Sequence, residues 1–402
     1  METAQNKIVK AALLGAGTVG SGVYQLVQER QEDFPHICGT QIQITKILVR
    51  DASKDREGIP SPLLTDNWNE IIEDDSISII IEVMGGIEPA KSYLLEAMKA
   101  GKQIVTANKD LIAEHGHELL DSAEKYGCDF KFEAAVAGCV PIIQVLKQSM
   151  SSENITEVMG IVNGTTNYIL TRMTQSGMSY DEALKEATDL GYAEADPTAD
   201  VDGLDAGRKI AIMASIAFHS RVTFSDVYIE GIRNITAKDI FYAKEFNSVI
   251  KLVGIARKDE EGIEVKVLPI LIPQNHPLAT VNDSFNAVFV HGTASDDTMY
   301  YGRGAGKLPT ASAVTGDLCT VARHMVENHN NLHVCSCYKE LPVKNIQDTH
   351  SRFFLRMQVT DRPGVLANIT SVFGTSQVSI AQIIQKSRQN GLAELVIITD
   401  EV

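Results

Sequence analysis

The sequence contains few cysteines and no long apolar run. Its six cysteines are scattered over 402 residues, a distribution typical of reduced thiols in a cytosolic protein and not of a disulfide framework. No apolar stretch approaches the roughly 18 residues that a transmembrane helix needs. The N-terminal residues METAQNKIVKAALLGAG do not follow the order of a secretory signal peptide. We therefore expect a cytoplasmic protein that does not insert into membranes.

Positive charge is also scarce. The 36 Lys and Arg residues are outnumbered by 52 Asp and Glu residues, which gives a net charge of −16 and a pI near 5.1. The resulting field repels nucleic acids and anionic membrane surfaces, so we expect neither as a partner. A small anionic ligand remains compatible, because it needs only a local group of N–H donors. The stretch HVCSC (333–337) has no second ligand pair at zinc spacing, so it does not predict a metal site.

The length favours two or three domains, and the composition, 44% hydrophobic and 22% charged, is that of a globular protein. Over the first part of the chain, expected strands alternate with helices. The strands are apolar on both faces, which predicts a parallel sheet covered by helices. They are expected within 8–20 and at 41–51, 76–86, 102–107 and 130–138.

The pattern changes after about residue 150. A strand runs into a turn and helix at 155–170, and strand pairs follow at 250–273 and 285–306, which predicts a mixed α+β domain. Further helices are expected at 181–191, 204–218 and 309–326. Beyond a polar linker at 338–351, the pattern predicts a small module of three strands and one helix. Such a module leaves an apolar face unpaired, so we expect a shortened chain or a partner that covers this face.

The string GAGTVG (15–20) matches the G-x-G-x-x-G pattern between a strand and a helix. In this pattern Gly15 allows the tight turn, Gly17 lets the backbone approach a pyrophosphate, and Gly20 lets the helix pack on the strand. The N–H groups at the start of the helix then bind the phosphates. An ordinary strand–helix turn can carry the same glycines, but the context favours a dinucleotide site.

The end of the second strand, LVRD, indicates which dinucleotide is bound. An acidic residue there binds the ribose hydroxyls of NAD, whereas an arginine accommodates the 2′-phosphate of NADP. Arg50 and Asp51 offer both options, and Lys54 and Arg56 add positive charge nearby. We predict a preference for NADPH, with NADH as the second option. The alternative is that Arg50 only pairs with Asp51 on the surface.

Two polar turns also follow buried strands. TANKD (106–110) places Lys109 at the carboxyl edge of the expected sheet, where α/β proteins bind ligands. NGTTN (163–167) offers Gly164 and Thr165 in a polar cradle that enters a helix. Taken alone, the first is equally typical of a solvated loop lysine, and the second of an ordinary capped helix start.

The stretch GYAEADPTADVDGLDAGRKIAIMA (191–214) holds five acidic residues within twelve positions. Asp205 and Lys209 share a helix face, and the apolar run that follows predicts a buried helix whose first turn lines a cleft. We interpret Glu194 and Asp205 as a pocket for a cationic substrate group, with Lys209 held beside it to transfer a proton. The alternatives are a solvated acidic loop and a surface ion pair worth only about 0.3–0.5 kcal/mol.

In combination, these strings resemble the homoserine dehydrogenases that carry a C-terminal ACT regulatory domain. The resemblance runs from about residue 8 to the end. It implies reversible NAD(P)H-dependent reduction of L-aspartate 4-semialdehyde to L-homoserine, on the route to threonine, methionine and isoleucine. It rests on GAGTVG, EVMGG, VTANKD, FEAAVAGCVPII, NGTTNYIL, GYAEADPTADVDGLDAGRK and GAGKLPTASAV, in the family's order.

The resemblance also implies roles for single residues. Lys209 would donate the proton, and Lys109 and Asp205 would complete the catalytic group. The substrate would be bound by Glu194, Asp205 and Thr165. The cofactor would be bound by Gly15, Ala16, Gly17, Thr18, Val19, Gly20, Arg50, Lys109, Gly164, Gly304 and Gly306. A sodium ion would be held by the backbone carbonyls of Glu133, Val136, Gly138 and Val140. Cys139 stands where glycine is expected, and Gly207 interrupts the catalytic helix, but neither removes a functional side chain.

For the fold, the resemblance implies an α/β protein with a Rossmann-type dinucleotide-binding domain (1–145), to which the helix at 309–330 returns. A substrate-binding and dimerisation domain with a mixed sheet (146–308) follows, then the linker and an incomplete ACT-like α+β module (352–402). A homodimer or homotetramer and a threonine effector at the ACT module are also implied. Two alternatives are a catalytically silent amino-acid sensor and an enzyme that reduces another small aldehyde or keto acid.

Overall fold

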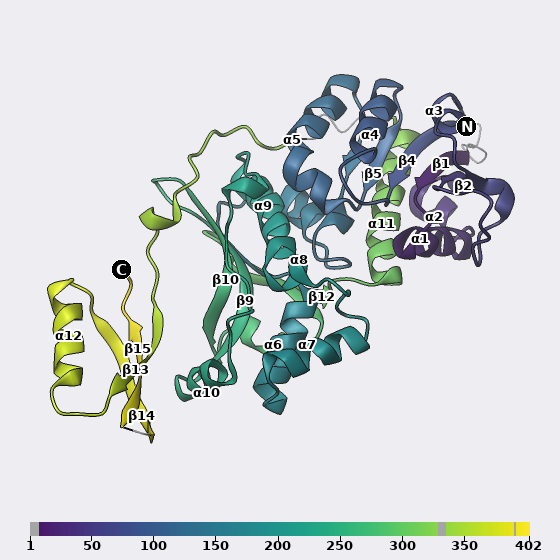
Figure 1. Cartoon of the computed structure of the whole chain (residues 1–402). Coiled ribbons are helices and arrows are strands. Elements are labelled where there is room, and N and C mark those ends of the chain that lie inside the picture. Colours follow the sequence, from purple (N-terminus) through teal and green to yellow (C-terminus); the bar gives the residue numbers. More distant parts are fainter. Residues whose placement is uncertain (1–7, 329–334, 390) are drawn as a thin grey trace.

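The computed structural model describes residues 8–328, 335–389 and 391–402. These residues form three sheets that follow one another along the chain, each with its own helices (Figure 1). His333 of the HVCSC stretch and the end of the helix expected at 309–330 lie outside the described residues. Within the described ranges, no helix is both long enough and apolar enough to span a membrane.

The first sheet has six parallel strands in the order β3-β2-β1-β4-β5-β6. This is the strand order of the doubly wound dinucleotide-binding fold, so the Rossmann-type domain predicted from the sequence is confirmed. Its strands are β1 (Ile8–Leu14), β2 (Gln41–Leu48), β3 (Leu64–Thr65), β4 (Ile77–Glu82), β5 (Gln103–Thr106) and β6 (Phe130–Lys131). The helices packed on it are α1 (Thr18–Glu29), α2 (Phe34–Cys38), α3 (Asn69–Ile72), α4 (Ala90–Lys99), α5 (Lys109–Tyr126) and α11 (Lys307–Glu327).

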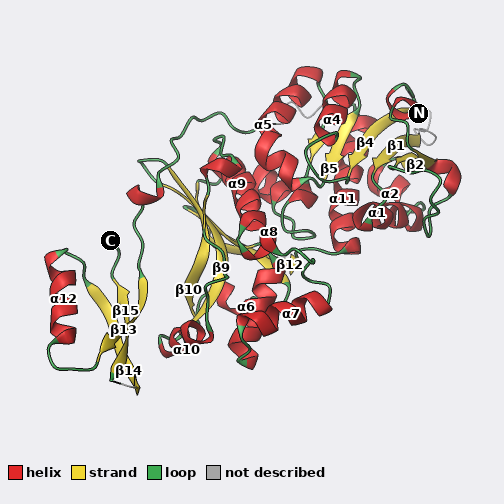
Figure 2. Cartoon of the chain, in the orientation of Figure 1, coloured by secondary structure: helices red, strands yellow, loops and turns green. Residues whose placement is uncertain are grey.

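Alternate side chains of β1 enter different cores, which explains why this strand is apolar throughout. Val9, Ala11 and Leu13 pack with residues of α1, α2 and α11, whereas Ala12 and Leu14 pack with residues of α4 and α5. Helices therefore cover both faces of the sheet (Figure 2). Helix α11 belongs to this core although it follows the second sheet in sequence.

Besides the short elements α2, α3 and β3, which were not predicted, two longer segments of this domain differ from the sequence prediction. The strand expected at 130–138 ends at Lys131, because the chain turns back so that the Glu133 carboxylate can accept hydrogen bonds from the N–H groups of residues 142–144. Ala137 and Gly138 both have positive φ in this turn (54° and 57°). Helix α5, eighteen residues long, was not predicted. It follows β5 directly, so Lys109 lies at the start of a helix and not in a loop.

The second sheet is mixed, with the order β12-β11-β7-β9-β10-β8. All its pairs are antiparallel except β10 with β8. Its strands are β7 (Ile155–Ile161), β8 (Tyr228–Ile229), β9 (Ser248–Lys258), β10 (Ile263–Pro273), β11 (Phe285–Gly292) and β12 (Asp296–Arg303). Its helices are α6 (Gly164–Ser176), α7 (Tyr180–Asp189), α8 (Thr198–Val201), α9 (Leu204–Phe218) and α10 (Ala237–Glu245).

Helix α9 packs against both the second sheet and α5, and most of its residues are buried, as its apolar sequence predicts. Glycines permit this close packing. A Cβ at Gly254 of β9 would lie 3.0 Å from the Ile210 side chain, and a Cβ at Gly207 would lie 2.6 Å from Ile229 of β8. Gly207 does not interrupt the helix as the sequence suggested: α9 continues through it, and the missing side chain makes room for β8.

The third sheet has three antiparallel strands in the order β13-β15-β14 and one helix. The strands are β13 (Phe354–Thr360), β14 (Ile380–Gln389) and β15 (Leu392–Thr399), and the helix is α12 (Val365–Thr375). The linker before it forms isolated bridges from Lys339 and Val343 to the second domain. The module itself contacts α10 through charged side chains of β13 and β15.

Candidate active site

The glycine turn between β1 and α1 is shaped for a phosphate group. Gly15 has a φ of +105°, and its N–H donates to the Leu48 carbonyl of β2 at 2.9 Å. A Cβ at Gly20 would lie 2.1 Å from the Gly15 carbonyl oxygen, so this glycine lets α1 close on the turn. A Cβ at Gly17 would meet nothing within 4 Å. No described side chain caps α1, so the N–H groups of its first turn (residues 18–20) remain available to an anion.

Arg50 lies two residues after the end of β2, whose last residue, Leu48, is bonded to this turn, and it is exposed. Asp51 has other partners: its carboxylate accepts hydrogen bonds from Ser53, which lower its pKa, and lies 3.8 Å from the Lys54 ammonium. Nothing in the described ranges pairs with the Arg50 guanidinium. The alternative in which Arg50 only pairs with Asp51 is therefore not observed.

The turn that carries Lys109 is fixed by a buried carboxylate at the end of β4. Glu82 accepts a hydrogen bond from the Thr106 hydroxyl at the end of β5, at 2.6 Å. Burial raises the pKa of Glu82, although the hydrogen bond from Thr106 and further hydrogen bonds oppose the shift. Asn108 then caps α5 with its side chain. The Lys109 side chain is thereby held at the carboxyl edge of the first sheet.

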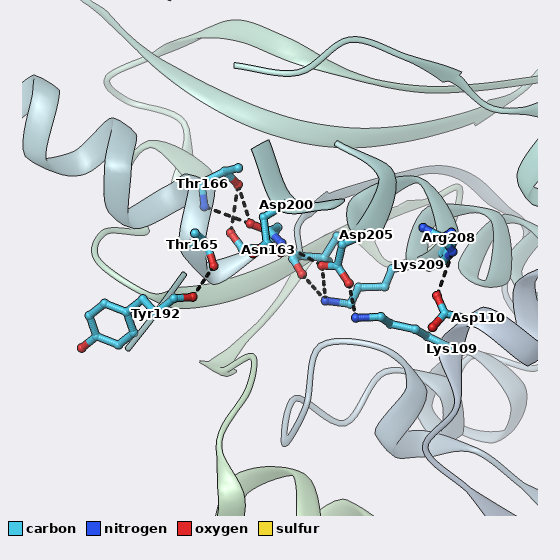
Figure 3. A network of polar contacts seen from close by, with 11 residues as sticks. Lys109, Asp110, Asn163, Thr165, Thr166, Tyr192, Asp200, Asp205, Arg208 and Lys209 are labelled. Atoms are coloured by element: carbon cyan, nitrogen blue, oxygen red, sulfur yellow. Dashed lines mark hydrogen bonds and ion pairs between the residues drawn. The ribbon is translucent and has the colours of Figure 1, made fainter. Parts of the chain in front are cut away.

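Asp205, in the first turn of α9, lies between two lysines (Figure 3). Its Oδ2 atom is 2.7 Å from the Lys209 ammonium, and its Oδ1 atom is 2.5 Å from the Lys109 ammonium. The Asp205 side chain is only 5% exposed, whereas Lys109 is partly open to solvent. The structure thus brings together the three residues that the sequence assigned to catalysis, one from α5 and two from α9. Because the sequence predicts catalysis for the first three, we call Lys109, Asp205 and Lys209, with Asn163 and Asp200 described below, the predicted catalytic group, shortened to the catalytic group.

Burial and charge act differently on these three side chains. Burial alone would raise the pKa of Asp205, but the charges of Lys209 and Lys109 outweigh it and hold that pKa below its usual range. Burial lowers the pKa of Lys209, and the Asp205 charge opposes this only in part. For Lys109 burial also acts downward, but Asp205 prevails and the pKa is raised. Lys209 is therefore the lysine that releases a proton more readily.

Lys209 also keeps a donor for a ligand. A protonated lysine carries three N–H donors. In Lys209 one binds Asp205, and a second binds the Val162 carbonyl at 2.7 Å. No third acceptor is found for it among the described residues, so one donor remains for a bound molecule.

Two residues to which the sequence gave no role complete the group. Asn163 caps α6 and donates hydrogen bonds to Asp205 at 2.8 Å and to Asp200 at 2.7 Å. Burial raises the pKa of Asp200, an effect that the Asn163 bond opposes. Thr165 donates to the Tyr192 carbonyl at 2.7 Å, which ties the start of α6 to the acidic stretch. Both motifs, NGTTN and 191–214, were recognised in the sequence; only the fold shows that they meet.

Only two of the five acids in 191–214 lie in the catalytic group. Asp202 pairs with Arg233, and Asp196 accepts a hydrogen bond from the backbone of α8. Glu194 is exposed, and within the described ranges nothing pairs with it, Lys209 included. The crowding of acids along the sequence is therefore relieved only in part, since Asp196 and Asp202 have partners of their own whereas Asp200 and Asp205 share Asn163.

The loop between β12 and α11 lies close to the first turns of α1. A Cβ at Gly22 of α1 would lie 2.8 Å from the Lys307 carbonyl oxygen, so the starts of the two helices pack tightly. Gly304 covers the buried Asn286: a Cβ there would lie 1.8 Å from the Asn286 amide oxygen. Gly306 has a φ of +129° and begins α11.

The turn at 133–140 reaches the same loop. The N–H of Cys139 donates to the Arg303 carbonyl at 3.2 Å. The carbonyl oxygens of Val136, Gly138 and Val140 accept no backbone hydrogen bond from the described residues, apart from any bonds within helices and strands. The carbonyl of Glu133 accepts only a long bond, 3.4 Å, from the Val136 N–H.

Comparison with known proteins identifies the family. The family described as "Homoserine dehydrogenase, NAD binding domain" matches residues 15–133, "Homoserine dehydrogenase" matches 141–319, and "ACT domain" matches 353–402. The chain is 46% identical over 396 residues to the homoserine dehydrogenase of Bacillus subtilis (strain 168), covering 98% of this chain and 92% of the relative.

Solved structures agree. A homoserine dehydrogenase from Thiobacillus denitrificans matches with a TM-score of 0.93 and 39% identity, covering 98% of this chain and 92% of that one. A hyperthermophilic archaeal homoserine dehydrogenase in complex with NADPH matches with a TM-score of 0.67 and 26% identity, covering 78% of this chain and 98% of that one. These matches support the enzyme over the silent sensor. The chain belongs to the homoserine dehydrogenase family, nicotinamide-dependent oxidoreductases that interconvert L-aspartate 4-semialdehyde and L-homoserine in amino-acid biosynthesis.

Proposed function

We propose that Lys209 donates the proton when the aldehyde is reduced. The spare N–H of this buried lysine carries the proposal, because its other donors are held by Asp205 and the Val162 carbonyl. Its lowered pKa also favours proton release. Bound nicotinamide supplies the hydride to the aldehyde carbon. The electron pair of the C=O bond moves to oxygen, which takes the Lys209 proton and becomes the hydroxyl of homoserine.

Lys109 and Asp205 fix the position of the Lys209 ammonium and tune its pKa. Asp205 keeps the Lys209 ammonium in place, at 2.7 Å. Lys109 stays protonated because its pKa is raised, so its charge favours the negative charge that develops on the substrate oxygen. The same charge lowers the pKa of Lys209. The proposal is tested by the loss of NADPH oxidation in Lys209→Met with cofactor binding preserved.

We assign the substrate ammonium to Glu194 and Asp205, with Thr165 at the border of the pocket. The charge of Asp205 is shared by two lysines, whereas the exposed Glu194 carboxylate faces no cation of the described chain. Glu194→Gln is therefore expected to raise the KM for aspartate semialdehyde and leave the KM for NADPH unchanged. Equal turnover of aldehydes that lack the ammonium group would contradict this assignment.

The cofactor is assigned to the glycine turn, with Gly15, Ala16, Gly17, Thr18, Val19 and Gly20 around the pyrophosphate. Open space at Gly17 and uncapped N–H groups support this. The nicotinamide end is assigned to Lys109, Gly164, Gly304 and Gly306. The exposed, unpaired Arg50 supports a preference for NADPH over NADH, and the archaeal relative is an NADPH complex. Arg50→Ala should weaken NADPH about 10–100-fold, the effect of losing a charged hydrogen bond. Equal weakening of NADH would contradict the assignment.

A sodium ion is assigned to the carbonyls of Glu133, Val136, Gly138 and Val140. The carbonyl oxygens of Val136, Gly138 and Val140 support this assignment. Outside helices and strands, none of them accepts a backbone hydrogen bond from a described residue. Oxygen ligands suit a hard cation. Such an ion would hold the 133–140 turn against the loop of Gly304. Replacing sodium by choline should lower thermal stability, and an unchanged melting temperature would contradict the assignment.

The remaining assignments concern the whole protein. We assign cofactor binding to residues 1–145 with 309–330, substrate binding and dimerisation to 146–308, and effector binding to 352–402.

The exposed Met299 and Tyr301 on the edge strand β12 support a homodimer or homotetramer. A hollow lined by Thr360, Arg362 and Gln385 beside the turn before α12 supports a threonine site. Six free cysteines suit the cytoplasm.

A further inference from the structure

A pair of thiols lies outside the catalytic group, in the segment after α11. Cys335 and Cys337 are both half-buried and free. Cys337 Sγ lies 3.5 Å from the Ser215 carbonyl oxygen of α9. Both cysteines line a cavity of about 60 Å³ between α5 and α9, together with Ile112 and Ile216.

Two cations line the same cavity. Arg221 also pairs with Asp121, at 2.7 Å, and the Lys147 ammonium lies 5.3 Å from the centre of the Phe132 ring. The neighbouring Cys337 side chain, together with both cations, lowers the pKa of Cys335 to about 6 although burial opposes the shift. The Cys335 side chain and burial raise the pKa of Cys337. At neutral pH Cys335 is thus the nucleophilic thiolate, and Cys337 keeps its proton.

A second thiol pair provides a contrast within the same chain. Cys38 and Cys319 are also neighbours, and the Cys319 side chain lowers the pKa of Cys38. However, Cys38 is only 2% exposed and packs in the core of the first domain, with Cys319 against it. Because a reagent must reach the sulfur to react, Cys38, the thiol of lowered pKa in that pair, is protected, whereas Cys335 is only half-buried.

We propose that Cys335 and Cys337 form a reactive dithiol site that exchanges with the disulfides of small thiols such as glutathione. The Cys335 thiolate attacks one sulfur of the disulfide, forms a mixed disulfide and releases one small thiolate. Cys337 then gives up its proton and attacks the Cys335 sulfur, which forms the Cys335–Cys337 disulfide and releases the second small thiolate. Two protein sulfurs are oxidised and one small disulfide is reduced; the Cys337 proton and one proton from water, which replaces the proton already lost by Cys335, protonate the two released thiolates.

The site is built for this second step. The two cysteines are separated by one residue and line the same cavity, so the disulfide forms without a large movement of the chain. A disulfide of this kind in a cytosolic protein is transient and serves as a redox response.

The test uses the full chain treated with oxidised glutathione at neutral pH, quenched by acid and read by peptide mass spectrometry. The first disulfide is expected between Cys335 and Cys337, with Cys38, Cys128 and Cys319 still reduced. Cys337→Ser should accumulate glutathione on Cys335, because the resolving thiol is missing. Cys335→Ser should react at position 337 at least about tenfold more slowly, because that thiol is protonated.

A pair of surface variants checks the role of charge. Arg221→Gln removes a cation that faces Cys335 and is expected to slow the reaction about threefold or more. Asp121→Asn removes only the partner of Arg221 and should not slow it. Modification of Cys139 or Cys319 as fast as Cys335 would overturn the proposal, as would the absence of a trapped adduct in Cys337→Ser.

Discussion

Two buried charge groups of this chain are made of similar side chains but are arranged differently. In the catalytic group, the buried carboxylate of Asp205 lies between Lys109 and Lys209. In a second group, Glu394 of β15 is bound by Lys238 at 3.1 Å and by Arg356 at 3.2 Å, and its side chain is only 6% exposed. We call Lys238, Asp239, Tyr242, Arg356 and Glu394 the docking group, because it joins α10 to the third sheet.

The charged side chains of the docking group are paired with one another. Arg356 donates to Asp239 of α10 at 2.8 Å as well as to Glu394, and the Tyr242 hydroxyl donates to Glu394 at 3.0 Å. The planar guanidinium can bridge two carboxylates in this way, which a lysine does less well. Two carboxylates thus face two cations, and each carboxylate accepts several hydrogen bonds from the chain.

The catalytic group is arranged differently. Two lysines share the Asp205 carboxylate, and Lys209 keeps one N–H without a partner among the described residues. A buried ion pair alone says little about function, because such pairs also serve as structural joints. The difference between the two groups lies in the donor left over, which a substrate oxygen would complete.

The strongest test of this comparison removes the spare donor. Lys209→Met should lower kcat by about 10²–10⁴, the range for a positioned acid, and leave NADPH binding nearly intact. The neighbouring Arg208 is the matched control. It pairs with Asp110 of α5 at 2.8 Å and stacks on Phe224, so Arg208→Met removes a charge of the same helix turn without touching the spare donor. A near-normal kcat in Lys209→Met would assign the proton to another group.

The next test removes the carboxylate from each group. Asp205→Asn keeps the shape of the side chain but removes the charge that opposes the effect of burial on Lys209. The pKa of Lys209 then falls, so the lysine loses its proton at lower pH. We expect kcat for reduction to fall roughly tenfold or more at neutral pH, with its alkaline decline shifted to lower pH. Glu394→Gln should leave this pH profile unchanged, and a shift in both variants would show that the two groups are not functionally distinct.

The sequence predicted the parts of both domains that depend on local patterns. The glycine turn, the buried helix at 204–218 and the Asp205–Lys209 pair follow from spacing along one chain segment. The contact of Lys109 with Asp205 joins α5 to α9, and that of Asn163 with Asp200 joins the start of α6 to α8, so neither leaves a local signal. The strand expected at 130–138 was wrong for a related reason: Glu133 turns the chain back to bind N–H groups that lie beyond it.

Helix α5 was missed although its sequence carries a usable pattern. Ile112, Leu119 and Ala123 are buried at helical spacing, Asn108 caps the start, and Gly127 follows the end with a φ of +66°. The polar residues between them, with three acids and two histidines in 114–121, weaken the apolar period. The docking group left no signal, since Arg356 and Asp239 are 117 positions apart and meet only when the third sheet reaches α10.

The docking group should affect stability and not turnover. Arg356→Met leaves Glu394 and Asp239 short of a cation and should lower the free energy of unfolding by about 1–3 kcal/mol, less than for a fully buried pair. Cleavage of the linker at 338–351 by added protease should become faster, while kcat stays unchanged. Arg352→Met is the control, because the pair of Arg352 with Asp400 is largely exposed.

Acid should also weaken the attachment of the third sheet to α10 in the parent protein. Burial would raise the pKa values of Glu394 and Asp239, but their hydrogen bonds and the charges nearby lower both. A lowered carboxyl pKa stabilises the folded state above the ordinary pKa, and the effect is lost as the pH falls through the folded value. Protease cleavage of the linker should therefore accelerate below about pH 4. If Arg356→Met shows the same acid response as the parent, these carboxylates do not hold the module in place.

The smallest expected effect is that of Lys238→Met. Lys238 binds the same carboxylate as Arg356, but its side chain is 55% exposed, so water screens the pair and its loss should cost only about 0–1 kcal/mol. In the Arg356→Met background Lys238 is the remaining cation on Glu394, and its removal should then cost more than in the parent. Unfolding of the two single variants and the double variant in urea measures this coupling. If the two single variants lose the same free energy of unfolding, the comparison fails. The strength of a cation's contribution would then depend neither on its burial nor on the number of carboxylates it binds.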